Sequence, residues 1–431
     1  MSRDFDVVIV GAGVIGTVMA GLLLARRLVE PGRVAIVADR FTPAAGTTAA
    51  AAAGTAAAGT TAAAAADWDL RVFALSRASQ RLLQLCGVWQ CLPPQRVSAY
   101  ERMCVWDASG EPQGAGSLTF DCAEIDEPNL GFIVEGRALQ ERCLHTAGAA
   151  GAVVIEAGVQ EATVSDTAAR IRLNDGRDLR AGLLIAADGT ESKTRELLGI
   201  DTAGHAYHQD ALVAHVRTGK SHQNTAWQRF LATGPLAFLP LPDGRSSIVW
   251  SAARAEAVRL AKLDAAAFDA ALEAASGGVL GDLELTTRVA SFPLKLQYAV
   301  DYVRPRAVLL GDAAHVVHPL AGQGLNLGLL DCATLADVLS AAGDPRLLGD
   351  YRLLRRYERW RKSENLLAVT AMDGLERLFS NANPALVRLR TAGLGAVGKL
   401  PFIKRQFAQR ALGLVGDVPA FLKDGRAWPH R

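Results

Sequence analysis

Three glycines near the start of the chain have a spacing that suits the binding of a diphosphate. Gly11, Gly13 and Gly16 form the pattern G-x-G-x-x-G directly after an apolar run. In this pattern the first glycine permits a tight turn and the second lets the backbone approach a pyrophosphate, while the third lets a helix pack close to a strand. The free N–H groups at the start of that helix would face the phosphate charge. The spacing therefore predicts a diphosphate-binding turn.

A second chemical element lies about three hundred residues later, where Gly311-Asp312 precedes HPLAGQGLN at residues 318–326. An acid at the end of a buried strand can accept hydrogen bonds from ribityl hydroxyls. Gly322 and Gly324 keep the start of the next helix free of side chains. The partial positive charge of that helix end would stabilise negative charge on the pyrimidine edge of a flavin. A dinucleotide held from both ends of one chain is most simply FAD.

Two further acids are candidates for contact with the same cofactor. Asp39 follows the strand expected at residues 33–38 and could reach a ribose hydroxyl, although Ala38 holds the usual strand-end position. Asp188 belongs to a strand, turn and helix start at residues 183–195. Because Asp-Gly alone is a common turn, Asp188 gains interest only from its place between the two other motifs.

Buried strands and helices must position these residues. Apolar runs of strand length at residues 6–10 and 306–310 precede the glycine motifs, and helix-length apolar runs at residues 14–25 and 325–341 follow them. This order predicts an α/β fold with a Rossmann-type FAD-binding domain.

The middle of the chain differs, because short apolar or alternating segments are separated there by turns. They lie at residues 211–216, 225–231, 236–240 and 246–250. They predict an inserted, mostly antiparallel β-sheet that would form the substrate wall. We expect an FAD-binding domain at residues 1–200 and 301–345, a substrate-domain sheet at 201–300, and a helical, basic C-terminal region at 346–431.

Two segments are unusual in composition. Residues 42–66 are almost entirely Ala, Gly and Thr, which cannot bury a core, so we expect a mobile surface insertion there. The C-terminal region mixes Arg and Lys with apolar residues. That pattern suits an anionic membrane surface or a partner protein or, equally, a solvated helix face packed on the first domain.

Overall composition excludes several functions. The 431 residues carry a formal net charge of +2, which gives no nucleic-acid footprint. No apolar run reaches the roughly 20 residues that span a bilayer. The six cysteines form no C-x-x-C pair and are expected to be reduced thiols in a cytoplasmic protein. His315 and His318 are three residues apart without a third ligand, so no metal site is predicted.

These motifs, together with DLRVFALSRAS at residues 69–79, resemble the class A flavoprotein aromatic hydroxylases. The subgroup that the chain resembles is the ubiquinone-biosynthesis hydroxylases. Further matching segments are LGFIVEGRALQERCL at 130–144 and QRFLATGPLAFLPLPDGRSSIVW at 228–250. The resemblance extends from residue 4 to about residue 410. It implies a fold like that of p-hydroxybenzoate hydroxylase.

The resemblance also implies roles for individual residues. Arg71 would lie against the adenosine and diphosphate side of FAD, and Arg137 would contact its ribityl or pyrophosphate region. Leu325 and Asn326, with Gly324, would offer backbone groups to the isoalloxazine ring.

The resemblance further implies a reaction and its participants. FAD, reduced by transiently bound NAD(P)H, would react with O2 to a C4a-hydroperoxide that hydroxylates the ring of a polyprenylated phenol. Pro319 would sit where the substrate ring and the flavin meet, with His318 beside it as a candidate for moving a phenol proton. Other ubiquinone-biosynthesis proteins would be partners, and the basic C-terminal helices would give peripheral contact with the inner face of the cytoplasmic membrane.

Three other functions stay open on the residues alone. A hydroxylase of a soluble aromatic acid or phenol would use the same flavin motifs, and its pocket should offer an arginine for a carboxylate. A flavin-binding, non-catalytic subunit of a quinone-synthesis complex would keep the fold without turnover. An NAD-dependent dehydrogenase fits the N-terminal glycines but leaves HPLAGQGLN unexplained.

Overall fold

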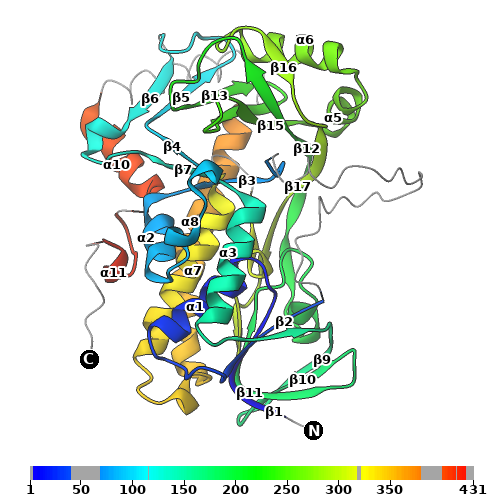
Figure 1. The fold of residues 1–431 in the computed structure, drawn as a ribbon, viewed down its shortest axis with the longest axis vertical. Helices are drawn as coiled ribbons and strands as arrows, with labels where there is room; N and C mark the ends of the chain where they lie inside the picture. Colours follow the sequence, from blue (N-terminus) through cyan, green and yellow to red (C-terminus); the bar gives the residue numbers. More distant parts are fainter. Residues whose placement is uncertain are drawn as a thin grey trace.

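The computed structural model describes residues 3–39, 68–114, 116–317, 322–379, 400–413 and 415–423. Within them, two large β-sheets lie at opposite ends of the molecule, and a small sheet lies between them (Figure 1). The insertion at 42–66, His318, Pro319 and the basic residues at 388–399 fall outside the described residues.

The first sheet is built around parallel strands, which confirms the predicted α/β domain. Its parallel strands, in spatial order, are β19 (Ala307–Leu309), β11 (Asp178–Ala186), β1 (Arg3–Val10), β2 (Val34–Ala38) and β8 (Val153–Glu156). Parallel neighbours need crossover connections, and α1 (Val14–Ala25) supplies the one from β1 to β2. The antiparallel additions are β18 (Val303–Arg304), beside β19, and the pair β9 (Val159–Val164) and β10 (Ala169–Leu173), which extends from β11.

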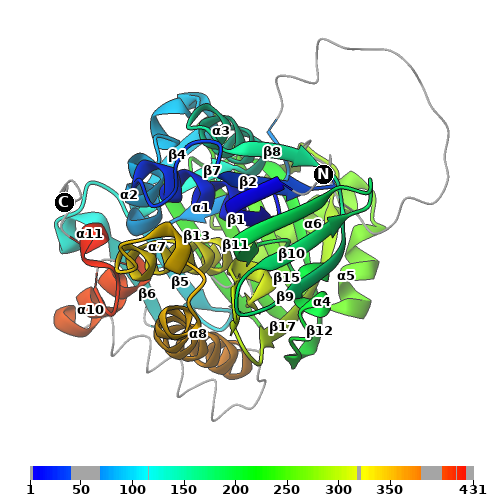
Figure 2. The same ribbon diagram turned by 90° about the horizontal axis from the view of Figure 1, so that it is seen from below.

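Helices cover one face of this sheet (Figure 2). They are α1, α3 (Gly136–Ala149), α7 (Gln323–Ser340) and the long α8 (Tyr351–Phe379). Helix α1 is apolar on nearly every side because it is enclosed by the sheet, α3 and α7, and Met19 and Leu23 are fully buried there. Smaller helices are α2 (Arg77–Leu85), α4 (Lys193–Leu197), α10 (Pro401–Ala411) and α11 (Ala420–Lys423). No described helix is both long and apolar enough to span a bilayer.

The second sheet confirms the predicted antiparallel domain. Its central strands are β17 (Ala290–Ala299), β12 (Thr202–Thr218), β15 (Ser246–Ala253), β14 (Gly234–Pro240) and β13 (Thr225–Leu231). Strands from outside the range 201–300 also join it, since β5 (Arg102–Asp107) pairs in parallel with β13 and is followed by β6 (Ser117–Asp121). At the other edges lie β16 (Leu283–Leu285) and β20 (His315–Val316). The domain boundaries themselves stay a prediction.

Alternation along these strands gives the second sheet two different faces. On one face, Leu212, Phe238 and Trp250 pack with Phe268 against α5 (Arg254–Ala261) and α6 (Ala265–Ser276). The opposite face turns toward the first domain. Between the two large sheets lies the small one, formed by β3 (Val72–Leu75), β7 (Gly131–Glu135) and β4 (Val97–Tyr100).

Candidate active site

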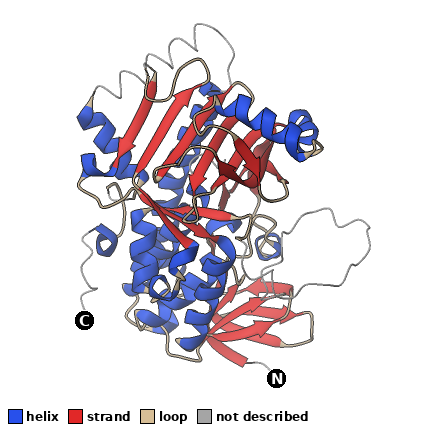
Figure 3. Cartoon of the chain, turned by 45° about the horizontal axis from the view of Figure 1, so that its top comes forward, coloured by secondary structure: helices blue, strands red, loops and turns tan. Residues whose placement is uncertain are grey.

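One continuous cavity of about 1690 Å³ is lined by residues of both domains. One part is lined by the turn after β1, strand β3 and the starts of α3 and α7. A second part is lined by the free face of the second sheet, and a third reaches helix α10. Figure 3 shows the two large sheets and the helices from which these walls come.

Gly13 marks the part of the cavity that suits a diphosphate. It lies at the N-cap of α1, where no side chain caps the helix, and a Cβ built on it would meet no atom within 4 Å. The N–H groups of the first turn of α1 are therefore available to an anion in the cavity. Gly13 also lines the cavity.

Gly11 and Gly16 have a different role, because they hold the turn together and do not line the cavity. Gly11 has a φ of +114°, and a Cβ on it would lie 2.2 Å from the carbonyl oxygen of Ala187. A Cβ on Gly16 would lie 2.0 Å from the carbonyl oxygen of Gly11. Both positions need glycine, Gly11 because of its positive φ in the turn and both because backbone atoms approach closely.

Asp312 lies at the end of β19 in the 3-10 turn Gly311–Ala313 and lines the cavity. Burial raises the pKa of its carboxyl group, while His315 and Arg71 oppose that increase. Arg71 also lines the cavity, with its guanidinium 4.9 Å from the centre of the Phe73 ring. Asp312 and Arg71, which are far apart in the sequence, thus both line the cofactor half of the cavity.

The start of α7 is fixed by the side chain of Asn326. Its amide nitrogen donates to the carbonyl oxygens of Ala74 (2.8 Å) and Gly322 (3.0 Å), and its amide oxygen accepts from the Ser76 N–H (2.9 Å) and the Ser79 hydroxyl (2.7 Å). The side chain is therefore fully used inside the protein. It is thus not free to bind a cofactor, whereas backbone groups at this helix start are, and Gly322, Gly324, Leu325 and Asn326 all line the cavity.

The remaining predicted cofactor residues are divided between the cavity wall and the protein interior. Asp39 and Arg137 line the cavity. Asp188 does not, because its carboxylate accepts hydrogen bonds from the Ser192 hydroxyl and from the Thr194 N–H (2.9 Å) at the start of α4. Asp188 thus holds the turn before α4 in shape, and the adjacent residue Gly189 lines the cavity.

A buried ionic network behind the Gly311 turn was missed by sequence reasoning. The Asp331 carboxylate accepts from Arg361 (2.7 Å) and from the backbone N–H of Gly311 (3.1 Å), and it lies 2.6 Å from Nε2 of His315. Burial alone would raise the pKa of Asp331, but His315 and Arg361 outweigh burial and lower that pKa to about 2. The one available signal was the presence of two acids, Asp331 and Asp337, in the mostly apolar run at 325–341.

The substrate half of the cavity is lined mainly by small apolar side chains. Cross-strand neighbours Ala237, Val249 and Val213 form one row across β14, β15 and β12. Phe292 of β17 lines the same space. Among the described residues of this wall, Arg288 is the charged one, and its side chain is exposed. Water would be poorly held by such a surface.

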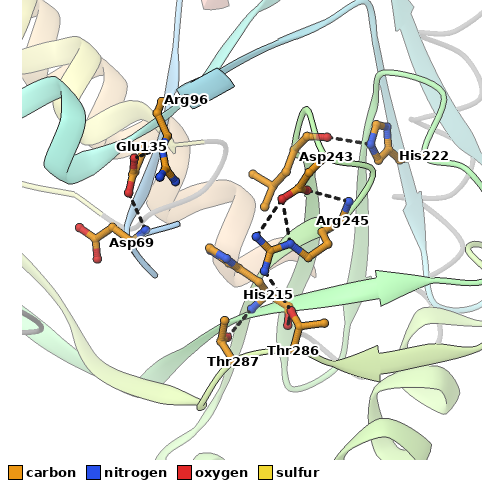
Figure 4. A network of polar contacts seen from close by, with 10 residues as sticks. Asp69, Arg96, Glu135, His215, His222, Asp243, Arg245, Thr286 and Thr287 are labelled. Atoms are coloured by element: carbon orange, nitrogen blue, oxygen red, sulfur yellow. Dashed lines mark hydrogen bonds and ion pairs between the residues drawn. The ribbon is translucent and has the colours of Figure 1, made fainter. Parts of the chain in front are cut away.

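Polar contacts hold the end of this wall near the small sheet (Figure 4). Thr286 donates to the carbonyl oxygen of His215 (2.9 Å), and Arg245 pairs with Asp243 (2.8 Å). Across from them, Glu135 accepts from the backbone N–H of Asp69 (2.7 Å) and pairs with Arg96. Asp69 and Thr287 both line the cavity, so the two clusters fix its edge.

The cofactor half fits FAD on its own geometry. It offers an open Gly13 position at one helix start, a Gly322 N-cap with a φ of +64° and no capping side chain at another, and an acid between them. A molecule with a diphosphate, a polyol and a ring that accepts negative charge matches this set of groups. No cluster of metal ligands occurs in the described part of the chain.

Comparison with solved structures shows the class of fold. The p-nitrophenol 4-monooxygenase PnpA from Pseudomonas putida DLL-E4 aligns with a TM-score of 0.73 at 18% identity, covering 96% of this chain and 99% of that chain. At that identity the similarity shows the fold alone. It is the fold of the flavin-dependent aromatic hydroxylases, as the resemblance implied.

Comparison of sequences shows the family. The model of the FAD binding domain family matches residues 147–365. The ubiquinone hydroxylase UbiL from Rhodospirillum rubrum is 36% identical, over 97% of this chain and 92% of its own length. The 3-demethoxyubiquinol 3-hydroxylase of Escherichia coli is 34% identical, over 80% of this chain and 88% of its own. The chain therefore belongs to the ubiquinone-biosynthesis hydroxylases and is an FAD-dependent monooxygenase.

Proposed function

We propose that the protein hydroxylates the aromatic ring of a polyprenylated phenol in ubiquinone biosynthesis. The observation that carries this proposal is the continuity of the cavity, which joins the cofactor half, an apolar wall for a ring and an apolar arm beside α10. The relatives named above, a ubiquinone hydroxylase and a 3-demethoxyubiquinol 3-hydroxylase, support the substrate class.

The arm beside α10 has the character needed for an isoprenoid tail. Leu130, Ala408 and Leu412 are buried together there, and Met103 and Phe120 pack against them. All five side chains line the cavity. Each buried CH2 group of a tail would contribute about 0.8 kcal/mol, so a surface of this kind favours a long apolar substituent over a soluble acid.

Bound FAD would supply the activation of O2, with two electrons from NAD(P)H, so that one oxygen atom enters the ring and the other leaves as water. The protein holds and orients the reactants. Gly13 and the start of α1 would bind the diphosphate, Asp312 the ribityl chain, and the backbone at Gly324 and Leu325 the ring of the cofactor. The apolar wall of the second sheet would exclude water and position the substrate ring. The roles of Pro319 and His318 stay predictions, since neither residue is described.

Contact with a membrane would follow from such a substrate. On α10, Phe402 is 74% exposed and Phe407 is 58% exposed, and Phe407 lines the mouth of the arm. The three basic residues of this helix are already paired, Lys404 with Glu124, Arg405 with Asp126 and Arg410 with Glu364. We therefore propose that exposed apolar side chains, more than the predicted basic charge, give peripheral contact at the cytoplasmic face, where other ubiquinone-biosynthesis proteins would meet the enzyme.

Arg288 favours a second candidate function. It is the kind of cation that a hydroxylase of soluble aromatic acids would use to bind a carboxylate, and it lines the cavity. It is, however, exposed, and the neighbouring wall is apolar. A tail-bearing phenol uses both the wall and the arm, whereas a small acid leaves the arm empty.

An oxygen-labelling experiment separates these functions. Purified holoenzyme would be given NADPH, 18O2 and a series of 2-prenylated phenols with one to four isoprene units, with 4-hydroxybenzoate as the soluble acid. We expect one labelled oxygen atom in each product and a kcat/KM that rises with tail length. Equal or better turnover of 4-hydroxybenzoate would support the soluble-acid hydroxylase. Flavin binding without labelled product from any compound would support a non-catalytic subunit.

A further inference from the structure

The buried amide of Gln228 stands out on the apolar wall of the substrate half. Gln228 lies on β13 and is only 6% exposed, yet it lines the cavity. It is paired across the sheet with Ala237 on one side and Val105 on the other. Cross-strand partners share a face, so its side chain belongs to the same row as the cavity-lining Ala237, Val249 and Val213.

Within the described part of the chain, this amide has no hydrogen-bond partner. Among the described residues, no hydrogen bond joins the Gln228 side chain to another group. Buried polar groups are satisfied in the great majority of cases, because an unmet donor or acceptor costs free energy. Asn326 makes the contrast clear, since all the hydrogen bonds of its buried amide are made within the chain. A ligand in the cavity that Gln228 lines can supply the partner that the described residues do not.

The chemistry of the Gln228 amide limits which ligand groups can form hydrogen bonds with it. It is neutral and offers both a donor and an acceptor, as does a phenol hydroxyl, and it can also donate to a ring ether. A carboxylate would instead be held by a guanidinium. One polar group in an apolar pocket fixes the orientation of a ligand.

We propose that Gln228 is a specificity-determining residue that hydrogen-bonds an oxygen substituent on the substrate ring. This inference rests on the proposed function, because it assumes that a phenol enters the cavity. The bond would select rings that already carry oxygen. It would also hold the ring in one orientation on the wall, and so help to decide which carbon is hydroxylated.

The test compares two ligands that differ by one oxygen atom. Binding of 2-geranylphenol and of geranylbenzene to the purified holoenzyme is followed through the change in flavin absorbance. The wild type should prefer the phenol by roughly two- to ten-fold, the range of one neutral hydrogen bond. In Gln228→Met the ratio of the two affinities should fall to about one, while the affinity for geranylbenzene is kept. An unchanged ratio in the variant, or no preference in the wild type, would overturn the inference.

Controls keep the result specific. Gln160→Met makes the same substitution at an exposed position on β9 of the first sheet, and it should leave the ratio unchanged. Gln228→Leu is measured in parallel, so that a folding defect in one variant does not decide the outcome; retained flavin shows that each variant is folded. Failure of the proposed function would appear in the wild type, as absence of labelled product from prenylated phenols, whereas failure of this inference would appear as an unchanged or absent preference for the phenol.

Discussion

The two halves of the cavity are built from different parts of protein structure. The cofactor half uses turns at strand ends and the starts of α1 and α7, so backbone groups and a few fixed acids face the ligand. The substrate half is a sheet face on which each strand contributes small side chains from alternate positions. Close glycine packing and buried ion pairs hold the first construction in place. The second is open to change, since single side chains can be exchanged without moving the backbone.

The sharpest test of this difference lies within one glycine motif. Gly16→Val would force side-chain atoms into the carbonyl oxygen of Gly11, which a Cβ already approaches to 2.0 Å, so we expect a loss of stability of about 3 kcal/mol or more. Gly13→Val meets open space and should keep the fold but lose FAD entirely. Thermal unfolding and flavin absorbance of the purified variants measure the two effects. A yellow Gly13→Val protein would show that this position does not hold the diphosphate.

Breaking the buried network should be the next largest effect. Asp331→Asn leaves the Arg361 guanidinium buried without its counter-ion, and such losses cost about 3 to 5 kcal/mol. Asp337→Asn on the same helix is the control, because Asp337 is only half-buried, and it should change stability by less than about 1 kcal/mol. Chemical denaturation compares them. Equal stabilities for the two variants would mean that the network does not hold the turn.

The same network predicts a dependence on pH. The pKa of Asp331 is about 2 in the folded protein, below its unfolded value of about 3.9, so its contribution is complete above pH ~4 and is lost as the pH falls toward 2. The loss is about 2 to 3 kcal/mol and should be missing in Asp331→Asn. Asp312 acts in the opposite direction, because burial raises its pKa. Denaturant unfolding between pH 2 and 5 measures the free energy of unfolding of the wild type and of Asp331→Asn. The difference between the two values should shrink as the pH falls toward 2.

In the cofactor half, Asp312→Ala should weaken FAD without unfolding the protein. Removal of a hydrogen bond to a charged group corresponds to roughly a ten- to a hundred-fold higher Kd. Titration of the apoprotein with FAD, followed by flavin fluorescence, gives this value. An unchanged Kd would remove Asp312 from the cofactor site.

In the substrate half, Ala237→Phe should weaken the binding of substrate and leave the binding of FAD unchanged. Ala237 is half-buried and lines the cavity, so a phenyl ring there would occupy the substrate space. We expect KM for a prenylated phenol to rise about ten-fold, through overpacking of about 1 to 3 kcal/mol, while the Kd for FAD stays within two-fold. If both constants changed together, the two halves would not be independent.

The comparison also explains what the sequence could predict. The strands and helices of the cofactor half could be predicted because strand, glycine turn and helix follow one another within about twenty residues, as around Gly11–Gly16 and Gly322–Asn326. The sheet was predicted strand by strand, but the pairing of β5 with β13 was not, because it joins segments more than a hundred residues apart. Gln228 and Asp331 escaped notice for the same physical reason. Their roles depend on register and packing between distant elements, which local spacing does not contain.

The central claim is that this cavity hydroxylates a prenylated ring, and quinone-intermediate profiling tests it most directly. Cells that lack the protein would be compared by mass spectrometry with the same cells complemented by the wild type or by Gly13→Val. We predict that a prenylated phenol short of one ring oxygen accumulates, disappears with the wild type, and persists with the variant that cannot hold FAD. A quinone pool that is the same in all these cells would contradict the account.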